Sequence, residues 1–153
     1  MKRGIFAFVA AAVLSAHASA QTPPLPGYLT ISMSGLGAGG VAGVSGDARL
    51  PIRTRDAGVV DGILQVRASG SRGSIRGVQF VIRSASAGHR YDAGRDAEMI
   101  FTFASGNAYT VDARRGWVQV NDVDGHRATG AFEATLTSAR PPLVVRGEFE
   151  ARY

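Results

Sequence analysis

The densest group of polar side chains in the sequence runs from Asn121 to His126, in the order Asn-Asp-Val-Asp-Gly-His. Carboxylate oxygens at alternate positions before a glycine suit a hard cation such as Ca²⁺, which collects oxygen ligands. Asp122 and Asp124 are therefore candidate metal ligands. The same residues also suit a hairpin turn, because an Asp-Gly pair accepts the positive φ angles of tight turns. We favour the turn and keep the metal site as the alternative hypothesis.

A second group consists of Arg49, Arg53 and Arg55. Their spacing by even numbers of residues would place all three on one face of a strand, around Pro51. Guanidinium groups bind phosphate, sulfate and carboxylate through paired hydrogen bonds. These arginines are therefore candidate ligand-binding residues for an anionic partner. The alternative is that they form an ordinary solvated surface.

Motifs that would indicate an enzyme or a cofactor are weak. Residues 35–40 match the spacing G-x-G-x-x-G, but residues 41–46 form a poor helix, and dinucleotide binding needs a helix N-terminus at that point. The chain has no cysteine, no G-x-S-x-G motif and no H-E-x-x-H motif. Outside the first twenty residues, only His89 and His126 could serve as imidazole bases. We therefore expect no catalytic residues and no cofactor.

The first twenty residues have the layout of a secretory signal peptide. Lys2 and Arg3 supply the positive end, residues 5–14 are apolar, and Ala18-Ser19-Ala20 is a small-x-small cleavage site. No cysteine stands at the cleavage point, so a lipid anchor is not expected. The sequence therefore predicts a signal peptide at 1–20 and a periplasmic or secreted protein. Export makes nucleic acid an unlikely partner.

The elements that must position these side chains are strands. In the last segment Leu143, Val145, Phe149 and Ala151 alternate with charged residues, which is the pattern of a strand with one buried face. Short turns between such segments favour antiparallel pairing, because parallel strands need long crossovers. We expect strands near the following ranges: 28–33, 48–54, 61–68, 75–83, 98–104, 108–113, 116–120, 127–136 and 143–152.

These segments predict a single all-β domain over residues 28–153. It would be an antiparallel meander of eight or nine strands that closes as a small barrel or folds as a β-sandwich. Residues 21–27 contain three prolines and should form a flexible N-terminal lead. Residues 34–46 are rich in glycine and should form a loop, which could also offer an adaptable binding surface.

Two resemblances concern the end of the chain. Residues 116–153 resemble the C-terminal meander of uncharacterised bacterial exported β-proteins, on Trp117-Val118-Gln119-Val120, on residues 130–134 and on residues 144–149. That likeness implies how the strands pack together, and it implies no activity. The alternation up to Tyr153 also resembles the last strand of outer-membrane barrels, whose apolar face meets lipid.

The function we expect is an exported, non-enzymatic β-domain with a binding or structural role at the cell envelope. Residues 21–95 carry nine arginines against four aspartates, which favours an anionic envelope component as partner. One alternative is a soluble barrel that carries a small apolar ligand, lined by Met99, Phe101, Phe103, Phe132, Phe149 and Tyr153. A small outer-membrane barrel is a further alternative, with membrane insertion the less favoured reading.

Overall fold

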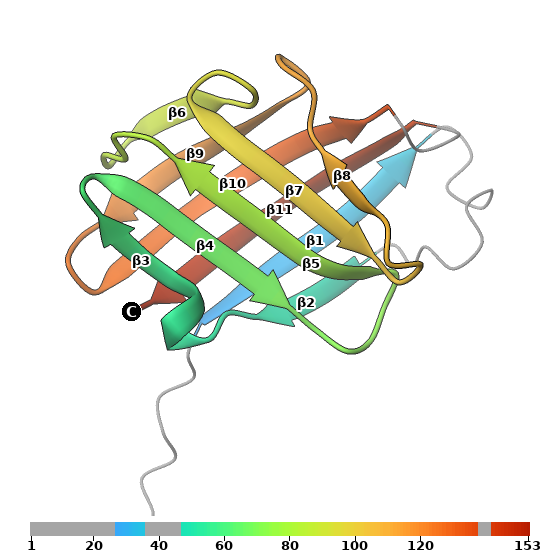
Figure 1. Cartoon of the computed structure of the whole chain (residues 1–153), viewed down its shortest axis with the longest axis horizontal. Coiled ribbons are helices and arrows are strands. Elements are labelled where there is room, and N and C mark those ends of the chain that lie inside the picture. The colour runs from blue at the N-terminus through green and yellow to red at the C-terminus, as the bar shows by residue number, and fades with distance from the viewer. Residues whose placement is uncertain (1–26, 36–46, 138–141) are drawn as a thin grey trace, which may run out of the picture.

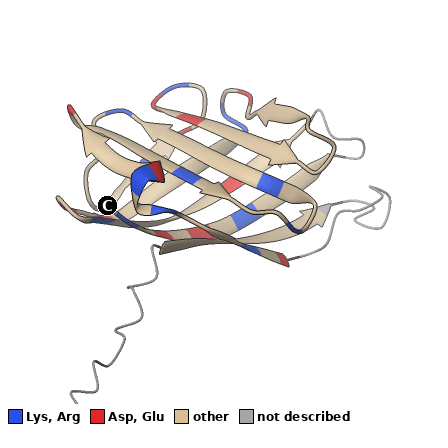
Figure 2. Cartoon of the chain, turned by 60° about the horizontal axis from the view of Figure 1, so that its bottom comes forward, with Lys and Arg blue, Asp and Glu red and all other residues tan. Residues whose placement is uncertain are grey.

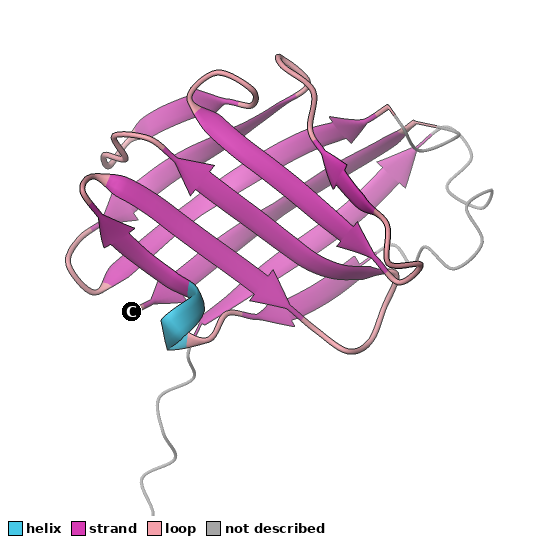
Figure 3. Cartoon of the chain, in the orientation of Figure 1, coloured by secondary structure: helices cyan, strands magenta, loops and turns pink. Residues whose placement is uncertain are grey.

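The structure is a computed structural model that describes residues 27–35, 47–137 and 142–153. Within these ranges the chain is all-β, with strands joined by loops and a single 3-10 turn, η1 (Thr54–Asp56) (Figure 1, Figure 3). The strands are β1 (Gly27–Gly35), β2 (Asp47–Pro51), β3 (Ala57–Val60), β4 (Ile63–Ser69), β5 (Ile75–Ile82), β6 (His89–Asp92), β7 (Ala97–Phe103), β8 (Ala108–Thr110), β9 (Gly116–Val123), β10 (Arg127–Leu136) and β11 (Leu143–Arg152).

The strands form two antiparallel sheets. Sheet A has the order β2-β1-β11-β10-β9-β6, and sheet B has the order β3-β4-β5-β7-β8. Figure 1 shows one sheet in front of the other, with their strands crossing. The described strands form no closed barrel, because no hydrogen-bonded ladder joins sheet A to sheet B. The prediction of an all-β, antiparallel chain is confirmed.

Apolar side chains from both sheets fill the space between them. The ring of Phe80 on β5 lies 4.9 Å from that of Phe132 on β10 and 5.7 Å from that of Phe149 on β11, between centroids. Phe101 on β7 reaches Phe132 at 6.1 Å. These phenylalanines and Met99 are at most 2% exposed. Three of the six residues expected to line a ligand cavity, Phe101, Phe132 and Phe149, are therefore packed ring against ring in the core, and Met99 is buried beside them.

Two glycines make room for these rings. In the β10–β11 ladder Gly130 stands opposite Phe149, and Phe132 stands opposite Gly147. A Cβ atom on Gly130 would lie 2.6 Å from the Phe149 ring, and one on Gly147 would lie 2.6 Å from the Phe132 ring. Each ring thus occupies the space that a side chain on the facing strand would need.

Three of the predicted hairpins are confirmed: β4–β5 around 71–73, β7–β8 around 105–107 and β9–β10 around 124–125. A fourth hairpin, β3–β4, was not predicted. Its turn residues Asp61 and Gly62 have φ angles of 52° and 76°, which match a tight turn with two left-handed residues. The strand predicted at 61–68 therefore begins at Ile63, two residues after its predicted start.

The prediction of a simple meander is wrong, because the described chain crosses between the sheets four times: from β2 to β3, from β5 to β6, from β6 to β7 and from β8 to β9. The predicted hairpin around Arg114-Arg115-Gly116 instead carries the chain from β8 in sheet B to β9 in sheet A. Strand β6 likewise leaves sheet B and pairs with β9. Alternation along a strand specifies which of its faces is buried, but it does not specify the sheet to which the strand belongs.

Several predicted segments lie outside the described residues. They are the signal peptide at 1–20, the lead at 21–27 apart from Gly27, and the glycine-rich loop at 34–46 apart from its first two residues. Gly27 already pairs with Ala151, and Ser34 and Gly35 end β1. Among the described residues, no helix has the length and apolar character needed to cross a membrane.

Candidate functional site

The three arginines singled out in the sequence do not share one strand face. Strand β2 ends at Pro51, and the chain then turns through η1, where the Asp56 N–H donates to the Arg53 carbonyl at 2.8 Å. Arg53 precedes this turn and Arg55 lies within it. The prediction of a common strand face over Arg49, Arg53 and Arg55 is therefore wrong, because alternation requires a strand that continues past Pro51.

Arg49 and Arg55 line different surfaces. Arg49 on β2 stands opposite Thr30, and its guanidinium lies 4.1 Å above the centre of the Tyr28 ring. It borders a hollow on the outer face of sheet A. Arg55 borders a hollow on the outer face of sheet B, together with Arg67. Each of these arginines therefore has to be judged with its own neighbours.

The outer face of sheet B carries a set of arginines that we call the basic strip: Arg55, Arg67 and Arg76. Arg55 and Arg67 line a hollow of about 350 Å³, which Gln65, Gln79 and Asp56 also line. Arg67 and Arg76 line the adjoining hollow of about 120 Å³. Arg67 belongs to both hollows, so it connects them into one surface.

The basic strip differs from sheet A in how its charges are paired. On sheet A the Arg146 Nε lies 2.6 Å from the Glu133 Oε2, and Glu150 meets both Arg127, at 3.6 Å, and Arg152, at 2.8 Å. The arginines of the basic strip form no ion pair with any residue in the described ranges. Both sheets carry charges of both signs (Figure 2), but among the residues that the structure describes only sheet A pairs them across its strands.

A hollow of about 650 Å³ lies on the outer face of sheet A, and we call it the sheet A groove. It runs from β2 to β9 across β1, β11 and β10. Its lining includes Trp117 and these polar residues: Thr30, Ser32, Asp47, Arg49, Glu133, Arg146 and Glu148. Trp117 is held by Arg90 of β6, whose guanidinium lies 4.3 Å above the ring centre. Sequence reasoning missed this groove, because its residues come from five strands.

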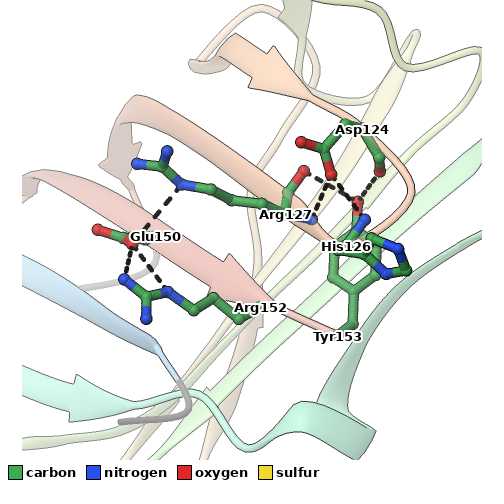
Figure 4. Close-up of polar contacts among 6 residues, drawn as sticks. All are labelled: Asp124, His126, Arg127, Glu150, Arg152 and Tyr153. Atoms are coloured by element: carbon green, nitrogen blue, oxygen red, sulfur yellow. Dashed lines mark hydrogen bonds and ion pairs between the residues drawn. The ribbon is translucent and has the colours of Figure 1, made fainter. Parts of the chain in front are cut away.

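Asp124 caps the β9–β10 hairpin (Figure 4). Its Oδ1 accepts the N–H groups of His126 at 2.6 Å and Arg127 at 2.8 Å. These backbone hydrogen bonds, that of His126 above all, lower the pKa of the Asp124 carboxyl below its ordinary value of 3.8. The carboxylate is therefore engaged by the turn, as the hairpin interpretation expects.

The metal hypothesis gains no further ligand. Asp122 is exposed and pairs with Thr129, next to an irregularity in the β9–β10 ladder. Within the described part of the chain, no group of three His, Asp or Glu side chains could hold a metal ion.

Tyr153 ties the end of β11 to the same hairpin. Its hydroxyl donates to the carbonyl oxygens of Asp124 at 2.9 Å and Arg127 at 3.2 Å, and its N–H donates to the His126 carbonyl. Loss of solvation, together with the charges of Asp124 and Asp122, raises the pKa of the Tyr153 hydroxyl. The hairpin and the last residue of the chain thus form one structural unit.

A contact between a serine and a histidine lies in the β5–β6 loop, and sequence reasoning missed it. The Ser86 Oγ lies 3.1 Å from the His89 Nδ1 and 3.2 Å from the Tyr91 hydroxyl. The Tyr91 hydroxyl donates to the Ser84 carbonyl and accepts the Ser86 N–H. The same Nδ1 also lies 3.0 Å from the Ala87 carbonyl, so this nitrogen is held within the loop. In a nucleophile–base pair a third group orients the histidine through its other ring nitrogen, and the hydrogen bonds of the described residues show no partner on the His89 Nε2. The contact braces the loop.

Comparison with known proteins gives no functional assignment for these sites. No protein family, curated protein or solved structure matches the chain. The two outer faces of the fold therefore carry the evidence for function.

Proposed function

We propose that this chain is a non-enzymatic binding domain that works at the cell envelope after export, and that it binds an anionic envelope component through the basic strip. One observation carries the proposal. Arg55, Arg67 and Arg76 line adjoining hollows and have no acidic ion-pair partner in the described ranges. Guanidinium groups without a carboxylate partner are available for the sulfate, phosphate or carboxylate groups of a ligand.

The charge of the strip supports an anionic ligand. Asp56 is the only acidic residue among those lining the two hollows, against three arginines. The amides of Gln65 and Gln79 add neutral hydrogen-bond donors to the first hollow. A ligand that carries negative charge would therefore be attracted to this face, and salt would weaken the attraction.

The spread of the arginines favours a polymer over a single small anion. Arg67 stands opposite Gln79 in the β4–β5 ladder, and Arg76 lies three residues before Gln79. From the strand rise and strand spacing, the Cα atoms of Arg67 and Arg76 are about 11 Å apart. Arg55 and Arg76 line different hollows. A chain with repeated charges, such as an acidic polysaccharide, would contact all three.

We also propose that the two sheets form a β-sandwich. Two sheets with no ladder between them and a phenylalanine-filled interior support a β-sandwich, whose two outer faces remain free to bind partners. On this reading the interior holds the fold together, and the ligand binds to the surface of sheet B.

The test is binding of the full chain to dextran sulfate, with uncharged dextran as the control probe. The double variant Arg67→Gln, Arg76→Gln removes two of the three charges. The matched control Arg127→Gln, Arg152→Gln removes two arginines that pair with Glu150 on sheet A. Two exposed contacts are together worth about 1–2 kcal/mol, so Kd should rise about five- to thirtyfold in the first variant only. Equal losses in both variants, or binding that does not weaken with salt, would refute the proposal.

A further inference from the structure

The sheet A groove lies on the outer face opposite the basic strip, because the two sheets form two layers with the core between them (Figure 1). It crosses five neighbouring strands, which corresponds to a length of about 19 Å at the usual strand spacing. The groove is open, long and shallow, so it suits an extended ligand better than a compact one.

The shape of the groove follows from the side chains on its floor and rims. Thr30 and Ala131 are small residues of the central strands β1 and β10. At one end stands Arg49, stacked on Tyr28, and at the other end stands Trp117, stacked under Arg90. Each stack holds a flat group in place at its rim, and such preorganisation lowers the entropy lost on binding.

The groove is lined by charges of both signs, two arginines and three carboxylates. Arg49 and Arg146 face Asp47, Glu133 and Glu148 within one lining, and Arg146 already pairs with Glu133 at 2.6 Å. A charged ligand would be repelled by part of this lining or would have to break that pair. A neutral ligand rich in hydroxyl groups would instead hydrogen-bond to the guanidinium and carboxylate groups as they stand.

We infer that the sheet A groove binds a neutral oligosaccharide chain. The apolar C–H face of a sugar ring stacks on the face of the Trp117 indole that the Arg90 guanidinium leaves uncovered, as apolar surfaces do on aromatic rings. Neighbouring sugar hydroxyls hydrogen-bond to Glu148, to the Arg146–Glu133 pair and to the hydroxyl of Ser32, all of which line the groove. This site is separate from the basic strip and takes a different class of ligand.

Trp117 provides a direct readout, because it is the only tryptophan in the sequence. The full chain is titrated with cellohexaose, chitohexaose and xylohexaose while its tryptophan fluorescence is followed. We expect a saturable change with at least one of these chains, and we expect it to persist at high salt. Calorimetry then measures the affinity of variants that lack the fluorophore.

Two variants locate the binding. Trp117→Ala should weaken binding at least tenfold. Glu148→Ala, at an exposed residue that can be changed without opening the core, should weaken it about threefold or more. The control Arg67→Gln, on the basic strip, should leave sugar affinity unchanged, which separates this inference from the anion-binding proposal.

Three outcomes would overturn the inference. The first is no fluorescence change with any of the three sugars. The second is sugar affinity that survives both Trp117→Ala and Glu148→Ala. The third is competition for the groove by an extended peptide or an anionic vesicle that binds more tightly than every sugar tested.

Discussion

Replacing Gly147 with alanine should destabilise the fold more than any other single methyl group added to a strand glycine with an ordinary φ angle. Gly147 lies on the inner face of β11, opposite Phe132. A Cβ atom there would meet the carbonyl oxygen of Thr30 and would lie 2.6 Å from the Phe132 Cζ. Neither neighbour can move freely, because Thr30 is held in the β1–β11 ladder and the Phe132 ring packs against Phe80 and Phe101.

The expected magnitude follows from overpacking. Forcing an extra methyl group into a packed core costs about 1–3 kcal/mol. The lower entropy of alanine in the unfolded chain offsets about 0.4–1 kcal/mol of that cost. At the centre of these ranges the net loss should be about 1.3 kcal/mol, or a fall in Tm of about 4–7 °C for a domain of this size.

The matched control is Gly58→Ala in β3. No atom lies within 4 Å of a Cβ at Gly58, and its φ angle is not in the left-handed region. This variant should be as stable as the parent or more stable by about 0.5 kcal/mol. Both variants are measured by thermal and urea unfolding of the full chain.

A double variant tests the physical cause. Phe132→Leu removes the ring that the new methyl group would strike but leaves its contact with the Thr30 carbonyl, so Gly147→Ala should cost less in that background, by about 0.5 kcal/mol or more. The reasoning is refuted if Gly147→Ala lowers Tm no more than Gly58→Ala does. It is also refuted if the two substitutions in the double variant are simply additive.

Two further predictions concern the unit formed by the β9–β10 hairpin and Tyr153. The pKa of Asp124 is lowered in the folded state by hydrogen bonds from the His126 and Arg127 N–H groups, so its stabilising effect is present above its ordinary pKa of 3.8 and is lost as pH falls through the lower folded value. Asp124→Asn keeps an oxygen acceptor but does not titrate, so urea unfolding of this variant should depend less on pH below about 3.8; an unchanged pH profile would contradict this. Tyr153→Phe removes the hydroxyl that donates to the Asp124 and Arg127 carbonyls and should cost about 1 kcal/mol. Hydrogen exchange should also be faster at the Arg127 and His126 amides, and exchange at the parent rate would contradict the proposed tie.

The burial pattern could be predicted from the sequence wherever alternation was long. In β11 the inner residues Leu143, Val145, Phe149 and Ala151 are buried, while Arg146, Glu148 and Arg152 are exposed. Strands of this length bury one full face, so period two is visible in their residue types.

Two of the short strands, β3 and β6, escaped prediction because four residues carry too little pattern, whereas β8 falls within the predicted segment 108–113. β3 is Ala-Gly-Val-Val and β6 is His-Arg-Tyr-Asp, and neither alternates clearly. Their places depend on partners distant in sequence, since β6 pairs with β9 across more than twenty residues. Local propensity does not contain that information.

The two candidate sites differ in how far they could be predicted from the sequence. Arg67 is an outward residue of a predicted strand, but its neighbourhood with Arg55 and Arg76 depends on the turn of η1 and on the β4–β5 register. The sheet A groove depends on strand order, because β1 lies beside β11. Sequence order alone would not place Arg49 and Trp117 at the rims of one groove.

The most direct test of the central claim is a map of backbone amide chemical shifts for the full chain, recorded with and without short dextran sulfate chains. The account predicts that shifts concentrate on Arg55, Arg67, Arg76 and Gln79, around the two hollows of sheet B, and that they disappear in high salt. Shifts that concentrate instead on β1, β10 and β11 of sheet A, or that spread evenly over every exposed arginine, would contradict it.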